Sequence, residues 1–409
     1  MRQLITNARI FDGSGSAPQL GAVAVEGDRI RELAWGAPGL AERPGDRVID
    51  AGGKVLMPGL VEAHAHLSWG SSVERIYHDF ILPPDEMKVA TYRNARVLLD
   101  HGFTSAYSAG ALAESLEVEL RSDIEGGRAP GPRLRASTIE RSPEGDAPQT
   151  GQVSHGRGPA AMRAFIDHCA DIGIDSVKLL ISGEDALLPG SSQHILYSDE
   201  ELAAADEGAR KHGLWLAAHT QAAQAIKLGL RHGVRVLYHC TWADSEALDM
   251  LEARRGDIFV APAIGIIVAT LEANPPPHVD MSAMKESAKP VIELASRLVP
   301  ELKRRGVRVL PGGDYGFPFN PNGRNARDLE HFVTLFGYTP AEALSAATRL
   351  GGEIMDLEVG LVKPGYLADL LLVDGDPTQD VRILQDKDRI AMIMKGGEMH
   401  KAPAQLAAV

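Results

Sequence analysis

A repeated sequence pattern in the middle of the chain constrains its fold more than any other feature of the sequence. In each repeat, a helical stretch ends in glycine and a short apolar run follows directly. Glycine suits a helix end because it adopts the left-handed conformation without steric cost, and a basic neighbour is favoured by the helix dipole. The apolar runs are typical of strands buried on both faces. Six glycines precede such runs: Gly102 before residues 103–107, Gly173 before 174–181, Gly213 before 214–218, Gly233 before 234–238, Gly256 before 258–261 and Gly306 before 307–310.

Two further strands complete the series, at residues 55–63 and at residues 133–137, which follow the turn sequence Pro130-Gly131-Pro132. Strands that alternate with helices predict a parallel sheet, and eight of them predict a closed (β/α)8 TIM barrel of the α/β class. Such a barrel takes about 250 residues. The chain has 409 residues, so the two ends need a separate explanation.

The two ends of the chain have the pattern of short strands and turns rather than of further barrel units. Apolar runs at 368–373 and 390–394 predict strands near one end, and residues 1–54 show the same pattern at the other. We therefore expect residues 1–54 and 352–409 to be the two parts of one small β-sandwich domain. The TIM-barrel catalytic domain is then expected to span residues 55–351.

Composition excludes several classes of protein. Hydrophobic residues make up 44% and charged residues 24% of the chain, which is typical of a globular protein. The formal net charge is −13, from 42 basic and 55 acidic residues, so a nucleic-acid partner is not expected. There is no apolar run of membrane-spanning length and no signal-peptide pattern, and Cys169 and Cys240 are too few for a disulfide framework. We expect a cytoplasmic protein with a small-molecule substrate and no membrane association, and a homo-oligomer remains open.

Four of the fourteen histidines fall at the carboxyl ends of predicted strands. His64 and His66 close the first strand, and their spacing of two places both on one face. His219 ends the fifth strand and His239 the sixth, while Asp314 follows the eighth. Barrel enzymes carry their active sites at this end, and imidazoles with a carboxylate suit a transition metal such as zinc. Each residue alone would more simply be a satisfied polar group, but five at one end favour a metal site.

Lys178 lies within the apolar fourth strand, at residues 175–181. A lysine buried in a strand is costly unless it is paired, chemically changed or lowered in pKa. Near the barrel mouth its amine could take up CO₂ as a carbamate, which would offer an anionic oxygen able to bridge two metal ions. An ion-paired lysine, or one that extends its amine to water, is the competing interpretation.

With these residues in place, the sequence resembles the amidohydrolase superfamily of metal-dependent hydrolases over nearly its whole length. The first and last matching segments are the most distinctive. The resemblance is carried by residues 57–66 (Met-Pro-Gly-Leu-Val-Glu-Ala-His-Ala-His), by 177–179, His219, His239 and 313–314, and by 365–370 (Gly-Tyr-Leu-Ala-Asp-Leu).

The resemblance implies a binuclear site with two divalent ions, most simply Zn²⁺. By this likeness His64, His66 and Asp314 would hold one ion, and His219 and His239 the other. Carboxylated Lys178 and a hydroxide would bridge the two. Asp314 would act as general base and then general acid, and a histidine of the second ion, His239, would help to hold the oxyanion.

Residues 174–183 are most similar to the branch of the superfamily that cleaves dipeptides or N-acyl amino acids, which is also the imidazolonepropionase-like branch. That branch often has a Gly-His-Gly-like loop after the third strand, whereas this chain has Gln152-Val153-Ser154-His155-Gly156. His155 is therefore either a substrate contact or an exposed loop residue. An aromatic wall from Trp69, Tyr77, Phe317 and Phe319 is a further expectation, with core packing as the alternative.

Other activities remain open at such a site. The same two ions would serve hydrolysis of a lactone, urea or carbamate. Deamination is less favoured, because deaminases of the superfamily lack the bridging lysine and carry a glutamate soon after the fifth-strand histidine, whereas residues 220–224 contain no acid. A non-enzymatic relative would be expected to have lost ligands, and all six positions are filled here.

Overall fold

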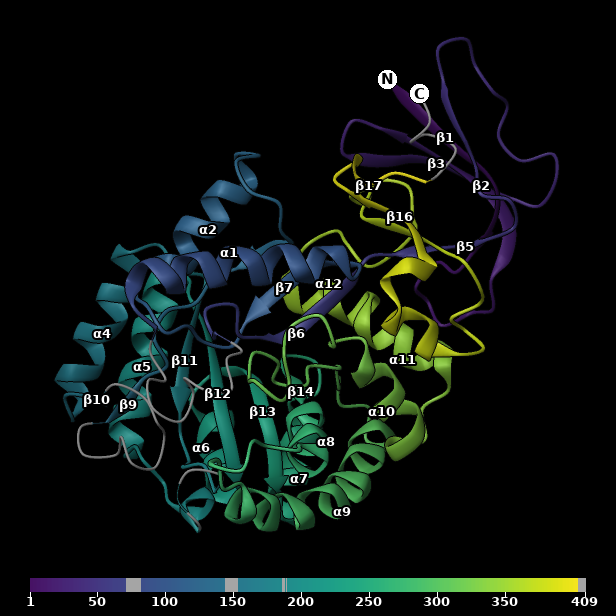
Figure 1. Ribbon diagram of the computed structural model, residues 1–409. Helices are drawn as coiled ribbons and strands as arrows, with labels where there is room; N and C mark the ends of the chain where they lie inside the picture. The colour runs from purple at the N-terminus through teal and green to yellow at the C-terminus, as the bar shows by residue number, and fades with distance from the viewer. Residues whose placement is uncertain (71–81, 144–153, 186–187, 189, 404–409) are drawn as a thin grey trace.

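A computed structural model describes residues 1–70, 82–143, 154–185, 188 and 190–403 (Figure 1). Within these residues, strands and helices alternate through the middle of the chain, while the strands near its two ends are largely antiparallel. The mixed α/β content predicted from the repeated sequence pattern is therefore confirmed.

Seven strands in the middle of the chain form two parallel sheets, in the orders β6–β7–β8 and β11–β12–β13–β14. Their bounds are β6 Leu60–Ala65, β7 Phe103–Ser108, β8 Arg133–Arg135, β11 Ser176–Leu180, β12 Trp215–Ala222, β13 Val234–Trp242 and β14 Phe259–Ala261. Of four single parallel bridges in the described part of the chain, one continues the pairing of β7 and β8, between Ala111 and Ile139. The other three extend the sheets to further segments: Arg141 with Leu179, Val260 with Val309, and Ala65 with Tyr315. A separate parallel pair consists of β9 (Ser142–Pro143) and β10 (Ser154–His155).

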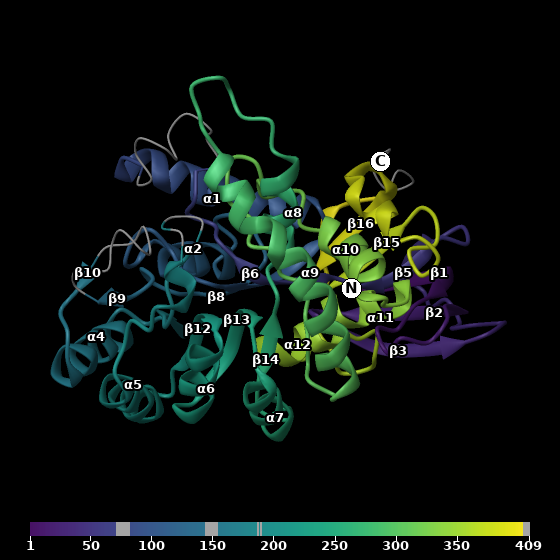
Figure 2. The same cartoon turned by 90° about the horizontal axis from the view of Figure 1, so that it is seen from below.

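Helices follow these strands in the expected alternation, and α5, α6 and α7 lie on the same side of β12–β14 (Figure 2). Their bounds are α1 Pro84–Asp100, α2 Leu116–Glu125, α4 Pro159–Asp171, α5 Asp199–His212, α6 Ala223–Arg231, α7 Ser245–Ala253, α8 Ile264–Glu272, α9 Ser282–Arg304, α10 Arg327–Phe336, α11 Pro340–Ala347 and α12 Arg349–Met355. Short 3-10 turns lie at Ser191–Gln193, Val381–Gln385 and Lys387–Arg389. Helix α5 illustrates how the sequence marks the two ends of a helix. Ser198 and Glu201 form a reciprocal capping box at its start, and Gly213 closes it with a φ of 68°.

The two ends of the chain contribute to one eight-stranded sheet, which we call the terminal sheet. Its order is β17–β16–β15–β5–β1–β2–β3, and β4 pairs with β1. The strands are β1 Arg2–Ile10, β2 Gln19–Glu26, β3 Arg29–Trp35, β4 Arg47–Asp50, β5 Val55–Pro58, β15 Leu370–Val373, β16 Ile390–Lys395 and β17 Glu398–Lys401. Figure 1 shows the first and last segments side by side. The sheet has an apolar core of its own, with Val23, Ile30, Leu56, Leu370 and Met392 among its buried members.

The predicted strand at residues 55–63 is two strands that belong to different sheets. β5 pairs with β1 and β15 in the terminal sheet, whereas β6 pairs with β7. Gly59 separates them, and its N–H donates to Asp369 O at 2.9 Å. Any larger residue would be excluded here, because a Cβ at this position would lie 2.0 Å from Thr104 Oγ1. The chain therefore passes from one sheet to the other within this unbroken apolar run, and the sequence pattern gives no sign of the change.

The predicted eighth strand, at residues 307–310, is only a single bridge at Val309. The segment does lie beside β14, because Leu310 N donates to Val260 O and Val260 N donates to Arg308 O, each at 2.9 Å. Pro311, which has no N–H to donate, follows at once and limits the ladder to these bonds.

Both cysteines, Cys169 and Cys240, are buried and free. Burial raises the pKa of each thiol to about 12, so both stay protonated and unreactive at neutral pH. In the described part of the chain, no helix has the length and apolarity needed to cross a membrane.

An ion pair joins the terminal sheet to β8. Arg133 donates from Nε and Nη2 to the two carboxylate oxygens of Asp369, at 2.9 and 3.1 Å, and Gly396 N donates to the same carboxylate at 2.7 Å. Asp369 is only 2% exposed. This fork geometry is the strong form of an arginine–carboxylate contact.

Replacing Asp369→Ala should lower the free energy of unfolding by about 3 kcal/mol, because Arg133 and Gly396 N would lose their partner in a largely buried place. Urea unfolding followed by circular dichroism would measure the loss. Glu293→Ala, which breaks an exposed pair with Arg297 on α9, should cost less than about 1 kcal/mol and is the matched control. Equal effects of the two substitutions would contradict a stabilising role for the Arg133–Asp369 pair.

Candidate metal centre

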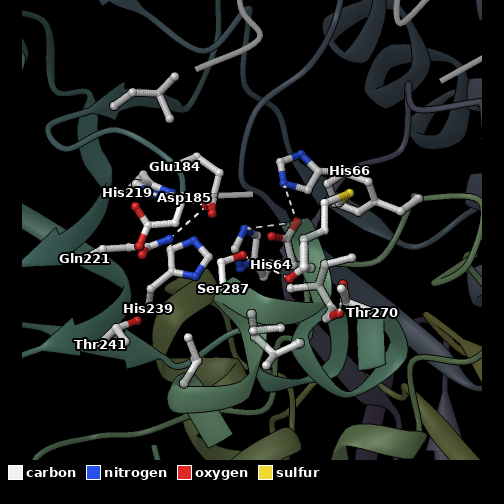
Figure 3. Close-up of a pocket in the computed structure, with 18 of the residues that line it drawn as sticks. His64, His66, Glu184, Asp185, His219, Gln221, His239, Thr241, Thr270 and Ser287 are labelled. Carbon is white, nitrogen blue, oxygen red and sulfur yellow. Dashed lines mark hydrogen bonds and ion pairs between the residues drawn. The ribbon is translucent and has the colours of Figure 1, made fainter. Parts of the chain in front are cut away.

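The five residues predicted at the strand ends converge on one point. Figure 3 shows the four histidines together, and Asp314 contacts His64 and His66. His64 lies in β6, His219 in β12 and His239 in β13, while His66 and Asp314 lie in segments that follow strands. All five are buried. The ring centroids of His219 and His239 are 4.3 Å apart, and those of His64 and His239 are 5.7 Å apart.

Two overlapping groups of potential ligand atoms occupy this point. One nitrogen each from His64 and His239 and one oxygen of Asp314 lie within 4.8 Å of one another. Glu184, His219 and His239 form a second such group. The two groups share His239, which the sequence analysis placed only with His219, and Glu184 was not predicted at all.

His66 lies next to the first group because it contacts Asp314. Its Nδ1 lies 3.0 Å from Gly110 O, a pure acceptor, so Nδ1 carries the proton in the neutral ring. Nε2 then presents a lone pair, and it lies 3.1 Å from Asp314 Oδ1. Two acceptors that face each other at this distance need either a shared proton or a cation, and a divalent metal ion could serve as that cation.

His219 is oriented in the same manner. Its Nε2 donates to Gly183 O at 3.2 Å, which leaves Nδ1 as the free lone pair of the neutral ring. A backbone carbonyl that fixes the tautomer and orientation of an imidazole is a common feature around protein metal sites. Both hydrogen bonds therefore prepare these histidines to bind a cation with the opposite ring nitrogen.

Burial keeps the imidazoles uncharged. Desolvation, together with Lys178 nearby, lowers the pKa of His64 well below its ordinary value and that of His219 to about 3. Desolvation and the neighbouring His219 lower the pKa of His239 well below its ordinary value. Among the described residues, His64 Nδ1 and Asp314 Oδ1 have no hydrogen-bond partner. Neutral imidazoles and a carboxylate with unused lone pairs fit Zn²⁺ and related ions well.

The backbone is strained at the same point. Three residues other than glycine have left-handed φ angles here, His239 at 70°, Cys240 at 56° and Asp314 at 61°. Such conformations cost about 1 to 3 kcal/mol each and persist only where the surroundings hold them. They aim His239 and Asp314 into the site.

Asp328 of α10 holds the loop that carries Asp314. Its carboxyl group accepts from Gly312 N at 3.0 Å and from the Tyr315 hydroxyl at 3.1 Å. Asn320 Nδ2 adds a bond to Asp314 O at 3.0 Å. Burial raises the pKa of Asp328 to about 7. The sequence analysis missed both supporting residues, since neither lies at a strand end.

Lys178 lies in β11 and is only 2% exposed. Its Nζ donates to Ala109 O at 2.8 Å and to Glu140 Oε1 at 3.0 Å, and it stands 4.6 Å from the centre of the Tyr238 ring. The ion-paired interpretation therefore describes the unmodified side chain. The carbamate stays a prediction.

Two predicted substrate contacts fall partly outside the described residues. His155 ends β10 and pairs with Pro143 of β9 through its backbone, but its side chain is not among those described. Tyr77 also lies outside the described residues. A substrate contact by His155 therefore stays a prediction.

A cavity of about 340 Å³ opens above the histidines. Trp69 stacks on His66 with centroids 4.2 Å apart, and Phe317 meets Trp69 edge-on at 4.5 Å. Phe319 also lines the cavity, so three of the four predicted aromatic residues do so. Helices α8 and α9 supply the remaining apolar wall, at Ile266, Ile267, Met284, Ala288 and Val291.

Comparisons with known proteins agree with this arrangement. A family model described as "Amidohydrolase family" matches residues 55–399. Ochratoxinase from Aspergillus niger is 23% identical over 380 residues, which cover 85% of this chain and 76% of that protein. Imidazolonepropionase from Rubrobacter xylanophilus is 25% identical over 416 residues, with 92% and 90% covered. The crystal structure of a putative prolidase from Bifidobacterium longum superimposes with a TM-score of 0.82 at 25% identity, covering 100% of this chain and 97% of that one.

Lowering the pH should destabilise the metal-free protein. The pKa of His219 is about 3 in the folded state and about 6.5 when unfolded. Between these values the unfolded chain binds more protons, so the free energy of unfolding falls as pH falls, by about 1.4 kcal/mol per pH unit for this group. His219→Gln should remove that part of the slope between about pH 6.5 and 4.5, measured by urea unfolding after chelation. Exposed His168→Gln is the control, and an unchanged slope in His219→Gln would contradict the prediction.

Proposed function

The chain belongs to the amidohydrolase family, and from this premise we propose that it hydrolyses an amide C–N bond of a small molecule, of the non-standard peptide or N-acyl amino acid type, at a site for two divalent ions. The resemblance noted in the sequence is confirmed by the family match over residues 55–399. The protein is thus a hydrolase of a family whose enzymes act on C–N bonds. One observation carries the proposal, the convergence of four buried imidazoles with Asp314 beneath an apolar cavity.

The proposed ligands follow the chemistry of the donor atoms. We assign His64, His66 and Asp314 to one ion and His219 and His239 to the other, with carboxylated Lys178 shared between them. Zn²⁺ suits this set because most of the donors are imidazole nitrogens. His239 belongs to both ligand groups, so the two candidate ion positions are neighbours.

The reaction needs a proton carrier, and we propose Asp314 for this role. When bound, the ions would acidify a water molecule and polarise the substrate carbonyl. Asp314 lines the cavity, and its Oδ1 has no hydrogen-bond partner among the described residues. It would take the proton released as the C–N bond is attacked and deliver it to the departing nitrogen. His239 would help to hold the carbonyl oxygen as it gains charge.

The cavity favours substrates with an apolar group beside the scissile bond. Its upper wall is formed by Trp69, Phe317, Phe319 and the apolar side chains of α8 and α9. Among the described residues that line it, Lys178 is the only lysine or arginine, and it is paired with Glu140. A substrate carboxylate, as in a dipeptide, would therefore depend on His155 or on a residue outside the described part.

Two other reactions fit parts of the site. Hydrolysis of a lactone, urea or carbamate would use the same ions and the same proton carrier. Deamination is a second candidate because Glu184 Oε2 lies 3.7 Å from His219 Nε2, so an acid does stand near the fifth-strand histidine although none follows it in sequence. Release of ammonia rather than an amine or acid would identify that reaction.

The finer features of fold and location are also proposals. The three single bridges that extend the parallel sheets support a closed (β/α)8 barrel at residues 55–351. The terminal sheet supports a β-sandwich domain built from residues 1–54 and 352–409, with β5 added to it. Free cysteines fit the reducing cytoplasm. A homo-oligomer can be tested by light scattering.

Lys178→Ala should lower kcat by about 100-fold or more, because the shared oxygen ligand would be lost. The enzyme would be loaded with Zn²⁺ and bicarbonate and screened against N-acyl amino acids, dipeptides, aryl amides, ureas, lactones and amino heterocycles. Lys211→Ala, which removes an exposed lysine on α5, is the matched control and should keep full activity. Full activity in Lys178→Ala would refute the carbamate proposal.

Val291→Asp should raise KM for aryl amides by about tenfold or more and change kcat much less, since it places a charge in the apolar wall and leaves the ligands intact. Initial rates with a matched pair of aryl and acetyl amides would measure this. Glu286→Asp, at an exposed position of the same helix, is the control. An equal effect on both amides would contradict a role of this wall in substrate selection.

A further inference from the structure

A second cavity, of about 410 Å³, adjoins the catalytic cavity. The same three parts of the chain line both: helix α8, the chain at the start of α9, and the loop at residues 317–321. On α8, for example, Thr270 lines the catalytic cavity and Ala273 lines the second one. Phe319 lines both, so its side chain stands at the boundary between them. The proposed reaction gives the second cavity no role.

A row of aromatic rings leads from the metal centre to this boundary. Trp69 stacks on His66 with ring centroids 4.2 Å apart, and Phe317 meets Trp69 at 4.5 Å. Phe319 then stacks on Phe317 at 5.8 Å. Rings at such separations are in contact and form one apolar surface. A substrate group that begins beside the proposed ions would therefore lie on apolar surface as far as Phe319 and the second cavity.

The second cavity has rigid walls. Proline fixes its own backbone angle and has no N–H to solvate, and four prolines line this cavity: Pro275, Pro276, Pro318 and Pro321. Asn320 anchors the loop between the last two, because its Nδ2 donates to Gly313 O at 3.1 Å and to Asp314 O at 3.0 Å. A cavity that is already formed loses little conformational entropy when a ligand enters it.

Arg324 gives the second cavity a positive charge. It lines the cavity and is exposed, and in the described part of the chain it forms no ion pair. Its Nη1 makes only a long contact of 3.4 Å with Phe319 O. The single acid among the described lining residues, Glu272, is engaged by Arg327 through two hydrogen bonds of 2.6 Å. The guanidinium of Arg324 is therefore available to a carboxylate, which it can bind with two parallel hydrogen bonds.

We propose that the second cavity is a substrate subsite for an extended apolar chain that ends in a carboxylate held by Arg324. The inference rests on the proposed function, because the chain must belong to a molecule whose amide bond lies at the ions. This carboxylate lies at the far end of the substrate, whereas that of a dipeptide lies beside the scissile bond. The enzyme thus selects amides by the length and the terminal charge of one substituent.

The test compares amides that differ only in one chain. Anilides of ω-carboxyacyl chains with two to eight methylenes would be assayed beside anilides of the matching alkanoic acids, with the full-length enzyme loaded with Zn²⁺ and bicarbonate. In wild type, kcat/KM should rise by about twofold to fourfold for each methylene that enters the second cavity. Chains long enough to reach Arg324 should gain about fivefold more when they end in a carboxylate rather than a methyl group.

Two variants assign these effects to the second cavity. Arg324→Gln should lose the gain from the terminal carboxylate, and Arg297→Gln, an exposed arginine farther along α9, is the matched control and should keep it. Ala273→Phe, which places a ring in the second cavity, should flatten the dependence on chain length. The proposal is overturned if wild type shows no dependence on chain length or if Arg324→Gln keeps the preference for carboxylate. Far-UV circular dichroism shows that the compared variants are folded.

A binding measurement separates failure of this inference from failure of the proposed function. Calorimetry with suberate and octanoate, which have equal chain lengths, should give a Kd about fivefold lower for suberate in wild type and no such difference in Arg324→Gln. If no amide is hydrolysed while this difference is found, the proposed function fails and the binding site stands. If amides are hydrolysed while neither chain length nor terminal charge matters, only the inference is overturned.

Discussion

The burial of uncharged imidazoles at the ends of parallel strands is the constraint on which the rest of the site depends. Without water, the protonated ring is costly, so the pKa values of His64, His219 and His239 fall and their lone pairs remain available at neutral pH. The carbonyl of Gly110 then fixes the tautomer of His66, and the carbonyl of Gly183 fixes that of His219, so the opposite ring nitrogen keeps its lone pair. Such a cluster has too few hydrogen-bond donors for its acceptors, and a bound divalent cation would correct that imbalance.

Buried acids hold the ligands without adding much charge. Glu62 accepts from His64 N at 2.9 Å and from Asn325 Nδ2 at 2.7 Å, and burial raises its pKa to about 8. Asp328 does the equivalent for the loop of Asp314, with a pKa of about 7. Near neutral pH Glu62 is therefore mostly protonated and Asp328 about half protonated, and both act as fixed hydrogen-bonding supports. Asp328 and Asn320 hold the strained backbone at Asp314 in place through these hydrogen bonds.

The sequence predicted the histidines better than it predicted their surroundings, and the reason is physical. Glycines that end helices and the two-residue alternation of strands show at which end of a sheet His64, His219 and His239 lie. Both signals are local properties of the chain and can be read from the sequence. Asp328 and Glu184 reach the site through loop conformation and through hydrogen bonds to residues distant in sequence, which leave no periodic signal. The division of residues 55–63 at Gly59 was hidden for the same reason, since only contact with Thr104 requires that glycine.

Formal charge links the two ions to Lys178. Among the described residues, four carboxylates line the cavity, those of Glu140, Glu184, Asp185 and Asp314, and Lys178 is the single lysine or arginine beside them. Carboxylation turns the lysine from positive to negative, and this change is the one that a second divalent ion would balance. The uptake of CO₂ and of the second ion should therefore be coupled, because either alone leaves buried charge without a partner.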